Sequence, residues 1–157
     1  MAITPITFHL VPGLRISPRR HAVGFLDGDP ELAWNQFSGL PQKERDFLMI
    51  GMGLWIDDTP ADRRHHNFPG TYADCHVFKH VHKNHRFYGF KYRPQPNSNE
   101  RFQLCIVTTY AFKPSDMDWG YLDRVHIWRD APATKKAIAF VFPDEEKRGS
   151  NDWSTLD

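Results

Sequence analysis

The spacing of apolar and polar residues changes from a helical to a strand-like pattern near residue 75. Before that point, apolar side chains recur at three- and four-residue intervals after Pro30 and again after Pro41, as on one face of a helix. Proline fits the first turn of a helix because its missing N–H has no partner there, and Gly39 is a common helix end. We therefore expect two helices, the second ending near Asp57.

Three strands are expected in succession after these helices. In CHVFKHVHK, which begins at Cys75, apolar residues alternate with His76, His80 and His82, as in a half-buried strand. A turn at Lys83-Asn84 leads into RFYGFKYR, and a turn-rich loop then joins this strand to the very apolar segment 101–112. Helical spacing returns up to Arg129, after a capping-box-like start at Ser115 and Asp118.

The two ends of the chain carry weaker signals. Residues 1–28 hold short apolar pieces broken by proline and glycine, which indicate one or two short strands or an irregular arm. Residues 134–142 suggest a last strand, and residues 143–157 form a polar tail that we expect to be mobile. A chain of 157 residues has room for one domain with a proper core, here residues 29–142.

The element order predicts an α+β fold. N-terminal helices would pack on one face of a twisted antiparallel sheet of about three to five strands, with a further helix after the last central strand. The other face of the sheet would stay open to solvent.

Composition limits the classes of protein to consider. No apolar run approaches the length of about 18 residues that a membrane span requires. The first residues do not resemble a secretory signal. We therefore expect a cytoplasmic protein. Cys75 and Cys105 do not form a CxxC pair, which argues against zinc-ribbon and thioredoxin-like sites and favours two buried free thiols.

Positive charge is concentrated in the middle of the chain. Residues 60–135 carry an excess of Lys and Arg over acids, whereas both flanking segments carry an excess of acids. The stretch from His76 to Arg93 contains four His, five Lys or Arg, five aromatic residues and no acid. An anionic partner would be held there.

Two kinds of chemistry suit this stretch. A metal site on His76, His80 and His82 would need further ligands, yet no acid occurs between Asp74 and Glu100, and the neighbouring cations would repel a divalent ion. We therefore expect no metal or other cofactor. His65, His66 and His126 are expected to be surface or capping residues.

A phosphodiester suits the positive charge better than a metal does. Lys and Arg bind phosphates, and aromatic faces stack on exposed bases. Cleaving RNA without a metal requires a base for the 2′-OH, stabilisation of the phosphorane and an acid for the leaving 5′-oxygen, and His, Lys and Arg can supply all three. A basic strand can also be a plain solvated face or an edge protected against aggregation.

From about Pro41 to Trp128 the chain resembles the RelE/ParE superfamily of bacterial toxins, and the segment TTYAFKPSDMDW is similar to the HigB branch. The resemblance rests on a helical pair, a connector, the strands of VFKHVHKNHRFYGFKYR, a further strand and a helix. Arg86 follows the tight turn, as an Arg often does in that family, and the basic step Phe112-Lys113 precedes the amphipathic helix.

The resemblance implies a metal-independent endoribonuclease, an mRNA interferase, which cuts RNA, commonly on the ribosome, and which is inhibited by a cognate antitoxin protein. It implies that Lys79 and Arg86 stabilise the phosphate, that Lys113 adds a positive group, and that His82 or His80 carries the proton. The same basic surface would bind RNA through Lys83, Lys91, Arg93, Tyr88, Tyr110 and Tyr121.

Two other functions remain open at this point. The chain could be a non-catalytic toxin, such as the gyrase-inhibiting ParE branch, or a phage or mobile-element protein that docks on a host partner. It could also be a metalloenzyme built on the three histidines His76, His80 and His82.

Overall fold

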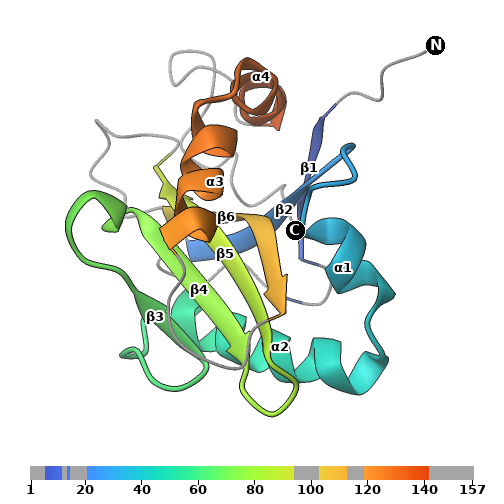
Figure 1. Cartoon of the computed structure of the whole chain (residues 1–157), viewed down its shortest axis with the longest axis vertical. Helices are drawn as coiled ribbons and strands as arrows, with labels where there is room; N and C mark the ends of the chain where they lie inside the picture. The colour runs from blue at the N-terminus through green and yellow to red at the C-terminus, as the bar shows by residue number, and fades with distance from the viewer. Residues whose placement is uncertain (1–5, 12–13, 15–20, 94–102, 113–118, 142–157) are drawn as a thin grey trace.

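The computed structural model describes residues 6–11, 14, 21–93, 103–112 and 119–141, and it contains a mixed β-sheet between two layers of helices (Figure 1). The sheet has six strands in the order β1-β2-β6-β5-β4-β3. β2 and β6 run parallel, and the other neighbouring strands are antiparallel. The strands are β1 (Thr7–Leu10), β2 (His21–Asp27), β3 (His65–Asn67), β4 (Cys75–His80), β5 (His85–Tyr92) and β6 (Gln103–Phe112).

The helices come in two pairs that are separated in the sequence. The first pair lies between β2 and β3, and the second follows β6. They are α1 (Trp34–Gly39), α2 (Gln42–Ile56), α3 (Trp119–Asp130) and α4 (Pro132–Val141), and a 3-10 turn spans Gly70–Tyr72. No helix among the described residues has the length and apolar character needed to cross a membrane.

The expected fold, with N-terminal helices on one face of an antiparallel sheet of three to five strands, is wrong. Two strands precede the first helix, the sheet is mixed, and two of the four helices follow its last strand. Residues 7–10 and 21–27, expected as short strands or an irregular arm, form β1 and β2. β2 enters the sheet by pairing with β6 along five positions, and β1 pairs with β2. The segment 21–26 is buried on both faces, as a strand inside a sheet must be.

The last element is a helix where a strand was expected. In α4, the buried residues Thr134, Ala137 and Ile138 recur at helical spacing and face one side. Pro132 occupies the first helical position, where proline is favoured. The helix packs on α3 and β1. Its apolar stripe is therefore buried by side-chain packing and not by hydrogen bonding to the edge of the sheet.

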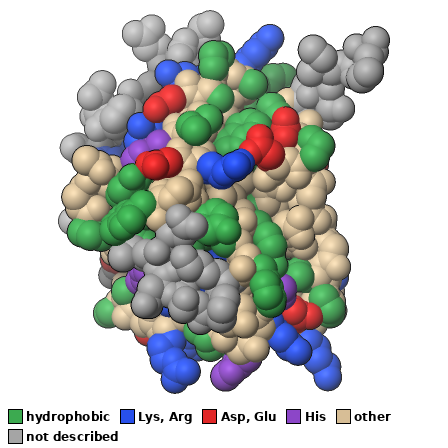
Figure 2. All heavy atoms as spheres, viewed as in Figure 1, with side chains coloured by type: hydrophobic (Ala, Val, Ile, Leu, Met, Phe, Trp, Pro, Cys, Tyr) green, Lys and Arg blue, Asp and Glu red, His purple; other side chains and the backbone are tan. Residues whose placement is uncertain are grey.

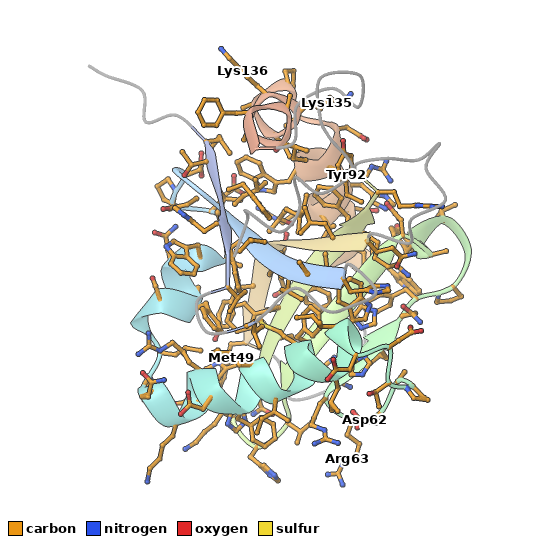
Figure 3. All side chains as sticks on the ribbon, turned by 180° about the vertical axis from the view of Figure 1, so that it is seen from behind. Met49, Asp62, Arg63, Tyr92, Lys135 and Lys136 are labelled. Carbon is orange, nitrogen blue, oxygen red and sulfur yellow. The ribbon has the colours of Figure 1, made fainter. Side chains whose placement is uncertain are left out.

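Both faces of the sheet are covered, which the sequence pattern did not predict. On one side α1 and α2 bury Phe37, Leu48 and Met52 against Phe25, Phe78, Phe87 and Val107. On the other side α3 and α4 bury Leu122, Val125 and Ile138 against Val77, Tyr88, Leu104 and Ile106. Each large apolar side chain stabilises the fold by about 1.5–3 kcal/mol. β4 is therefore buried on both faces, and the expected open face is wrong (Figures 1 and 3).

A β-bulge in β6 determines which side chains share a face. Tyr88 pairs with Thr109, but the next residue, Gly89, pairs with Val107, so Thr108 has no partner on β5. One extra residue reverses the alternation of side chains beyond it. The strands approach closely here, because a Cβ on Gly89 would lie 2.5 Å from the Ile106 carbonyl oxygen. The Thr108 carbonyl oxygen accepts a hydrogen bond from the Ala33 N–H at the start of α1.

Candidate active site

Three polar side chains from three elements meet at one end of the α2 layer. His85 Nε2 lies 2.7 Å from Glu44 Oε1, and His85 Nδ1 lies 2.8 Å from the Tyr110 hydroxyl. Glu44 comes from the first turn of α2, His85 begins β5, and Tyr110 lies near the end of β6. A carboxylate, an imidazole and a phenol thus form a continuous hydrogen-bonded chain, the Glu44–His85–Tyr110 relay.

Local sequence explains the positions of Glu44 and His85, and strand pairing explains that of Tyr110. Pro41 starts α2 and places Glu44 in its first turn. Asn84 adopts a positive φ of 59°, which Asn tolerates better than most residues, and this closes the β4–β5 turn directly before His85. The bulge at Thr108 puts Tyr110 on the α2 side of β6, because without the extra residue Tyr110 would face α3.

The relay can accept or deliver a proton at Tyr110. When His85 is neutral, its Nε2–H is donated to Glu44 and its Nδ1 accepts the Tyr110 hydroxyl proton. When His85 is protonated, its Nδ1–H is donated to the Tyr110 oxygen, and the phenol O–H is then available to a bound group. Burial, together with the charge of Glu44, raises the pKa of Tyr110 and keeps it a phenol. Such a pair of states is what general acid–base chemistry uses.

Two more histidines and two phenylalanines surround the relay. The His80 ring stacks on Phe47 with ring centroids 4.1 Å apart, and His82 meets the same phenylalanine edge-on. The His80 ring lies 6.1 Å from His85, and burial lowers the pKa of His80, which favours the neutral imidazole. Phe112 contacts His85 and is 66% exposed, so its ring is available for stacking on a base.

Positive side chains project around this end of the molecule. Lys43, on the first turn of α2, and Lys83, in the β4–β5 turn, are both exposed. Figure 2 shows Lys and Arg side chains and a histidine at its lower end, where Figure 1 places α2 and the β4–β5 turn. A phosphate group would find cations next to the relay.

The residues expected to act together lie on both sides of the sheet. Lys79 and Arg86 pair across β4 and β5, on the side of α3. His80 is on the opposite side with His85, and His82 is exposed in the turn. Tyr110 joins the relay, whereas Tyr121 stacks on Tyr88 in the α3 layer with ring centroids 5.8 Å apart.

The remaining residues expected to bind RNA are scattered. Lys83 is exposed in the turn beside the relay, Arg93 is exposed past the end of β5, and Lys91 bonds to Asn67. Lys113 lies outside the described residues. Of the expected residues that the structure describes, Tyr110, His80, His82 and Lys83 are the ones brought together.

A second histidine pair lies deeper in the α2 layer. His65 Nδ1 is 3.0 Å from His76 Nε2, His76 Nδ1 is 2.8 Å from Asn67 Oδ1, and Lys91 donates to the same Asn67 oxygen. Burial lowers the pKa of both imidazoles, that of His76 to about 2. The prediction that His65 is a surface or capping residue is wrong, because its exposed fraction is 1%.

Cys75 and Cys105 are both free and buried, as predicted. Within the described part of the chain, the donor atoms of His76, His80 and His82 do not gather into a group that could hold a metal. His66 is partly buried, and His126 contacts Asp74 and Cys75.

Sequence reasoning missed Glu44 and His85 as partners. They are 41 positions apart, so no local pattern connects a carboxylate on a helix with an imidazole on a strand. The only available signal was that His85, like His80 and His82, belongs to the histidine-rich stretch.

Known proteins do not identify the chain. No family model matches it, and no curated protein or solved structure matches it either.

Proposed function

We propose that the protein is a metal-independent endoribonuclease that uses the Glu44–His85–Tyr110 relay. The observation that carries this proposal is the carboxylate–imidazole–phenol chain, with both ring nitrogens of His85 engaged at 2.7 and 2.8 Å. The exposed Lys43 and Lys83 and the exposed ring of Phe112 support a substrate with phosphates and bases. A role as a toxin with a cognate antitoxin, and action on the ribosome, stay predictions from the sequence resemblance.

The proposed reaction transfers phosphorus from one ribose oxygen to another. The 2′-oxygen attacks the phosphorus while His80 or His82, as a neutral imidazole, takes the 2′-hydroxyl proton. The bond to the 5′-oxygen breaks, and this oxygen takes the proton of Tyr110. Protonated His85 replaces that proton through its Nδ1–H, while Glu44 accepts the hydrogen bond of the Nε2–H. The products are a 2′,3′-cyclic phosphate and a 5′-hydroxyl, and the reaction requires no metal.

Cleavage of a labelled single-stranded RNA in excess EDTA tests this proposal. The wild type should give fragments ending in a cyclic phosphate, and an RNA with 2′-deoxyribose at the cleaved position should stay intact. Tyr110→Phe should lower the cleavage rate about 100-fold or more, since it removes the acid. Tyr121→Phe is the matched control, because Tyr121 stacks in the opposite layer.

Two outcomes would overturn the proposal. One is a folded wild-type protein that binds RNA or a host protein and cleaves no RNA. The other is a Tyr110→Phe variant that cleaves as fast as Tyr121→Phe, which would place the chemistry away from the relay.

A further inference from the structure

A second group of reactive side chains lies on the other side of the sheet, away from the relay. Cys75 begins β4, Asp74 directly precedes it, and both contact His126 of α3. The Cys75 Sγ is 3.4 Å from His126 Nε2 and 3.8 Å from Asp74 Oδ1, and the latter oxygen is 2.9 Å from the same nitrogen. These three donor atoms all lie within 4.8 Å of one another.

The three separations fit the coordination sphere of zinc. With bonds of about 2.3 Å to sulfur and 2.0–2.2 Å to nitrogen and oxygen, tetrahedral ligand atoms lie about 3.3–3.6 Å apart. The observed 3.4, 3.8 and 2.9 Å differ from this range only slightly, so small side-chain rotations suffice. Thiolate, imidazole and carboxylate are the ligand types that zinc prefers in proteins.

Neighbouring groups hold two of these donors in place. Arg129 Nη1 donates to Asp74 Oδ2 at 2.8 Å, which leaves Oδ1 directed at His126 and Cys75. The Tyr72 ring stacks on the His126 ring with ring centroids 5.2 Å apart, and the Tyr72 hydroxyl bonds to Asp123. A hydrogen-bonded partner such as Arg129 orients a ligating carboxylate, and the ring stack limits rotation of His126.

The charges around the group also balance those of a divalent ion. Arg129 is paired with both Asp74 and Asp130. With Cys75 as a thiolate, two carboxylates, one thiolate and one guanidinium offset the two charges of zinc. Cys75 is fully buried, whereas the side chains of Asp74 and His126 are 31% and 19% exposed, so an ion and a water ligand reach the group from their side.

We propose that Asp74 Oδ1, Cys75 Sγ and His126 Nε2 bind one zinc ion, with a water molecule as the fourth ligand. Binding breaks the Cys75 S–H bond, releases that proton to solvent and forms the zinc–sulfur bond. The His126 proton moves to Nδ1, so that Nε2 donates its lone pair. The bound ion cross-links the start of β4 to α3. This site is independent of the proposed ribonuclease activity, because it lies in the opposite layer.

Titration of the reduced, metal-free protein with Co²⁺ tests the site. Cobalt in a tetrahedral site with a cysteine ligand gives a thiolate charge-transfer band and intense visible bands, and zinc should then displace it at one ion per chain. Cys75→Ser should abolish the charge-transfer band. Cys105→Ser is the matched control and should retain it, since Cys105 is a buried thiol in the α2 layer.

Two further measurements keep the test decisive if Cys75→Ser folds poorly. His126→Gln alters a partly exposed ligand and should weaken cobalt binding at least about tenfold. Zinc at a hundred times its Kd should raise the unfolding temperature of the wild type by about 5–10 °C, and that of His126→Gln by much less. The proposal is overturned if the wild type gives no thiolate band, or if Cys75→Ser or His126→Gln binds the metal as tightly as the wild type.

Discussion

Two histidines of the same stretch, His76 and His85, lie on the same side of the sheet and differ in what other elements bring to them. His76 contacts His65 and Asn67, both neutral, and burial lowers its pKa to about 2. His85 lies between a carboxylate of α2 and a phenol of β6. The residue type is the same, but of the two only His85 has a carboxylate partner. The partner from a distant element therefore decides which histidine of this stretch suits the proposed proton transfer.

The largest expected effect comes from giving His85 a neutral partner like those of His76. Glu44→Gln keeps the size of the side chain and a hydrogen bond to His85 Nε2, but it removes the negative charge beside the ring. We expect RNA cleavage to slow about 100-fold or more with little change in unfolding temperature. Glu31→Gln, which alters an exposed ion pair with Arg124, is the control and should cleave normally. Equal rates for the two variants would contradict the relay.

The next largest expected effect is on the free energy of unfolding, and it concerns the bulge that brings Tyr110 to His85. A Cβ on Gly89 would lie 2.5 Å from the Ile106 carbonyl oxygen and 3.0 Å from the Val107 Cα. Gly89→Ala should therefore lower the free energy of unfolding by about 2–3 kcal/mol in urea denaturation. Gly39→Ala, where a Cβ meets nothing within 4 Å, should change it by less than about 1 kcal/mol. Similar values for the two variants would refute the close approach of β5 and β6.

A smaller effect appears in the pH dependence of stability. The pKa of His76 is 6.5 in the unfolded chain and about 2 in the folded protein. Below pH 6.5 the unfolded state binds a proton that the folded state excludes, so His76 stabilises the fold fully above that pH and progressively less below it. The loss is about 1.4 kcal/mol per pH unit.

His76→Gln should remove this part of the slope. Urea denaturation between pH 7 and pH 4.5 should show the free energy of unfolding of the variant falling less steeply than that of the wild type. Parallel curves for the two proteins would mean that His76 takes up a proton in the folded state.

The smallest expected effect concerns the two cations that the sequence resemblance made central. Lys79 and Arg86 lie on the α3 side of the sheet, opposite His80 and His85. Lys79→Ala and Arg86→Ala should leave kcat within about twofold, and at most weaken RNA binding a few-fold with a shallower salt dependence. A fall in kcat by orders of magnitude would instead support the roles that the resemblance implies.

Local patterns predicted the elements whose signals lie within a few residues. The helix after Pro41, the turn at Asn84 and the three central strands are of this kind, and the buried thiols follow from apolar neighbours. The strand expected at 134–142 is a helix, because its buried residues Thr134, Ala137 and Ile138 have helical spacing. The short apolar run in the same segment is equally typical of a strand.

The rest depends on contacts between distant parts of the chain. β2 enters the sheet by pairing with β6, about eighty positions later, and no local sequence pattern predicts this pairing. The face on which Tyr110 lies depends on the one extra residue, Thr108. Alternation along β4 predicts one open face, whereas in the structure Phe47 and Trp55 of α2 cover the histidines of this strand. The chemistry of the site thus follows from tertiary pairing, whereas its location near the β4–β5 turn follows from sequence.

The most direct measurement compares the single-turnover rates of RNA cleavage by His85→Gln and His76→Gln under the same conditions in EDTA. Both variants replace a buried or half-buried histidine on the same side of the sheet with the same residue, and circular dichroism establishes that both are folded. We expect His85→Gln, like Glu44→Gln, to cleave at least about 100-fold more slowly than the wild type, and His76→Gln to stay within a few-fold of it. Equal rates for the two variants would contradict the role of the Glu44–His85–Tyr110 relay.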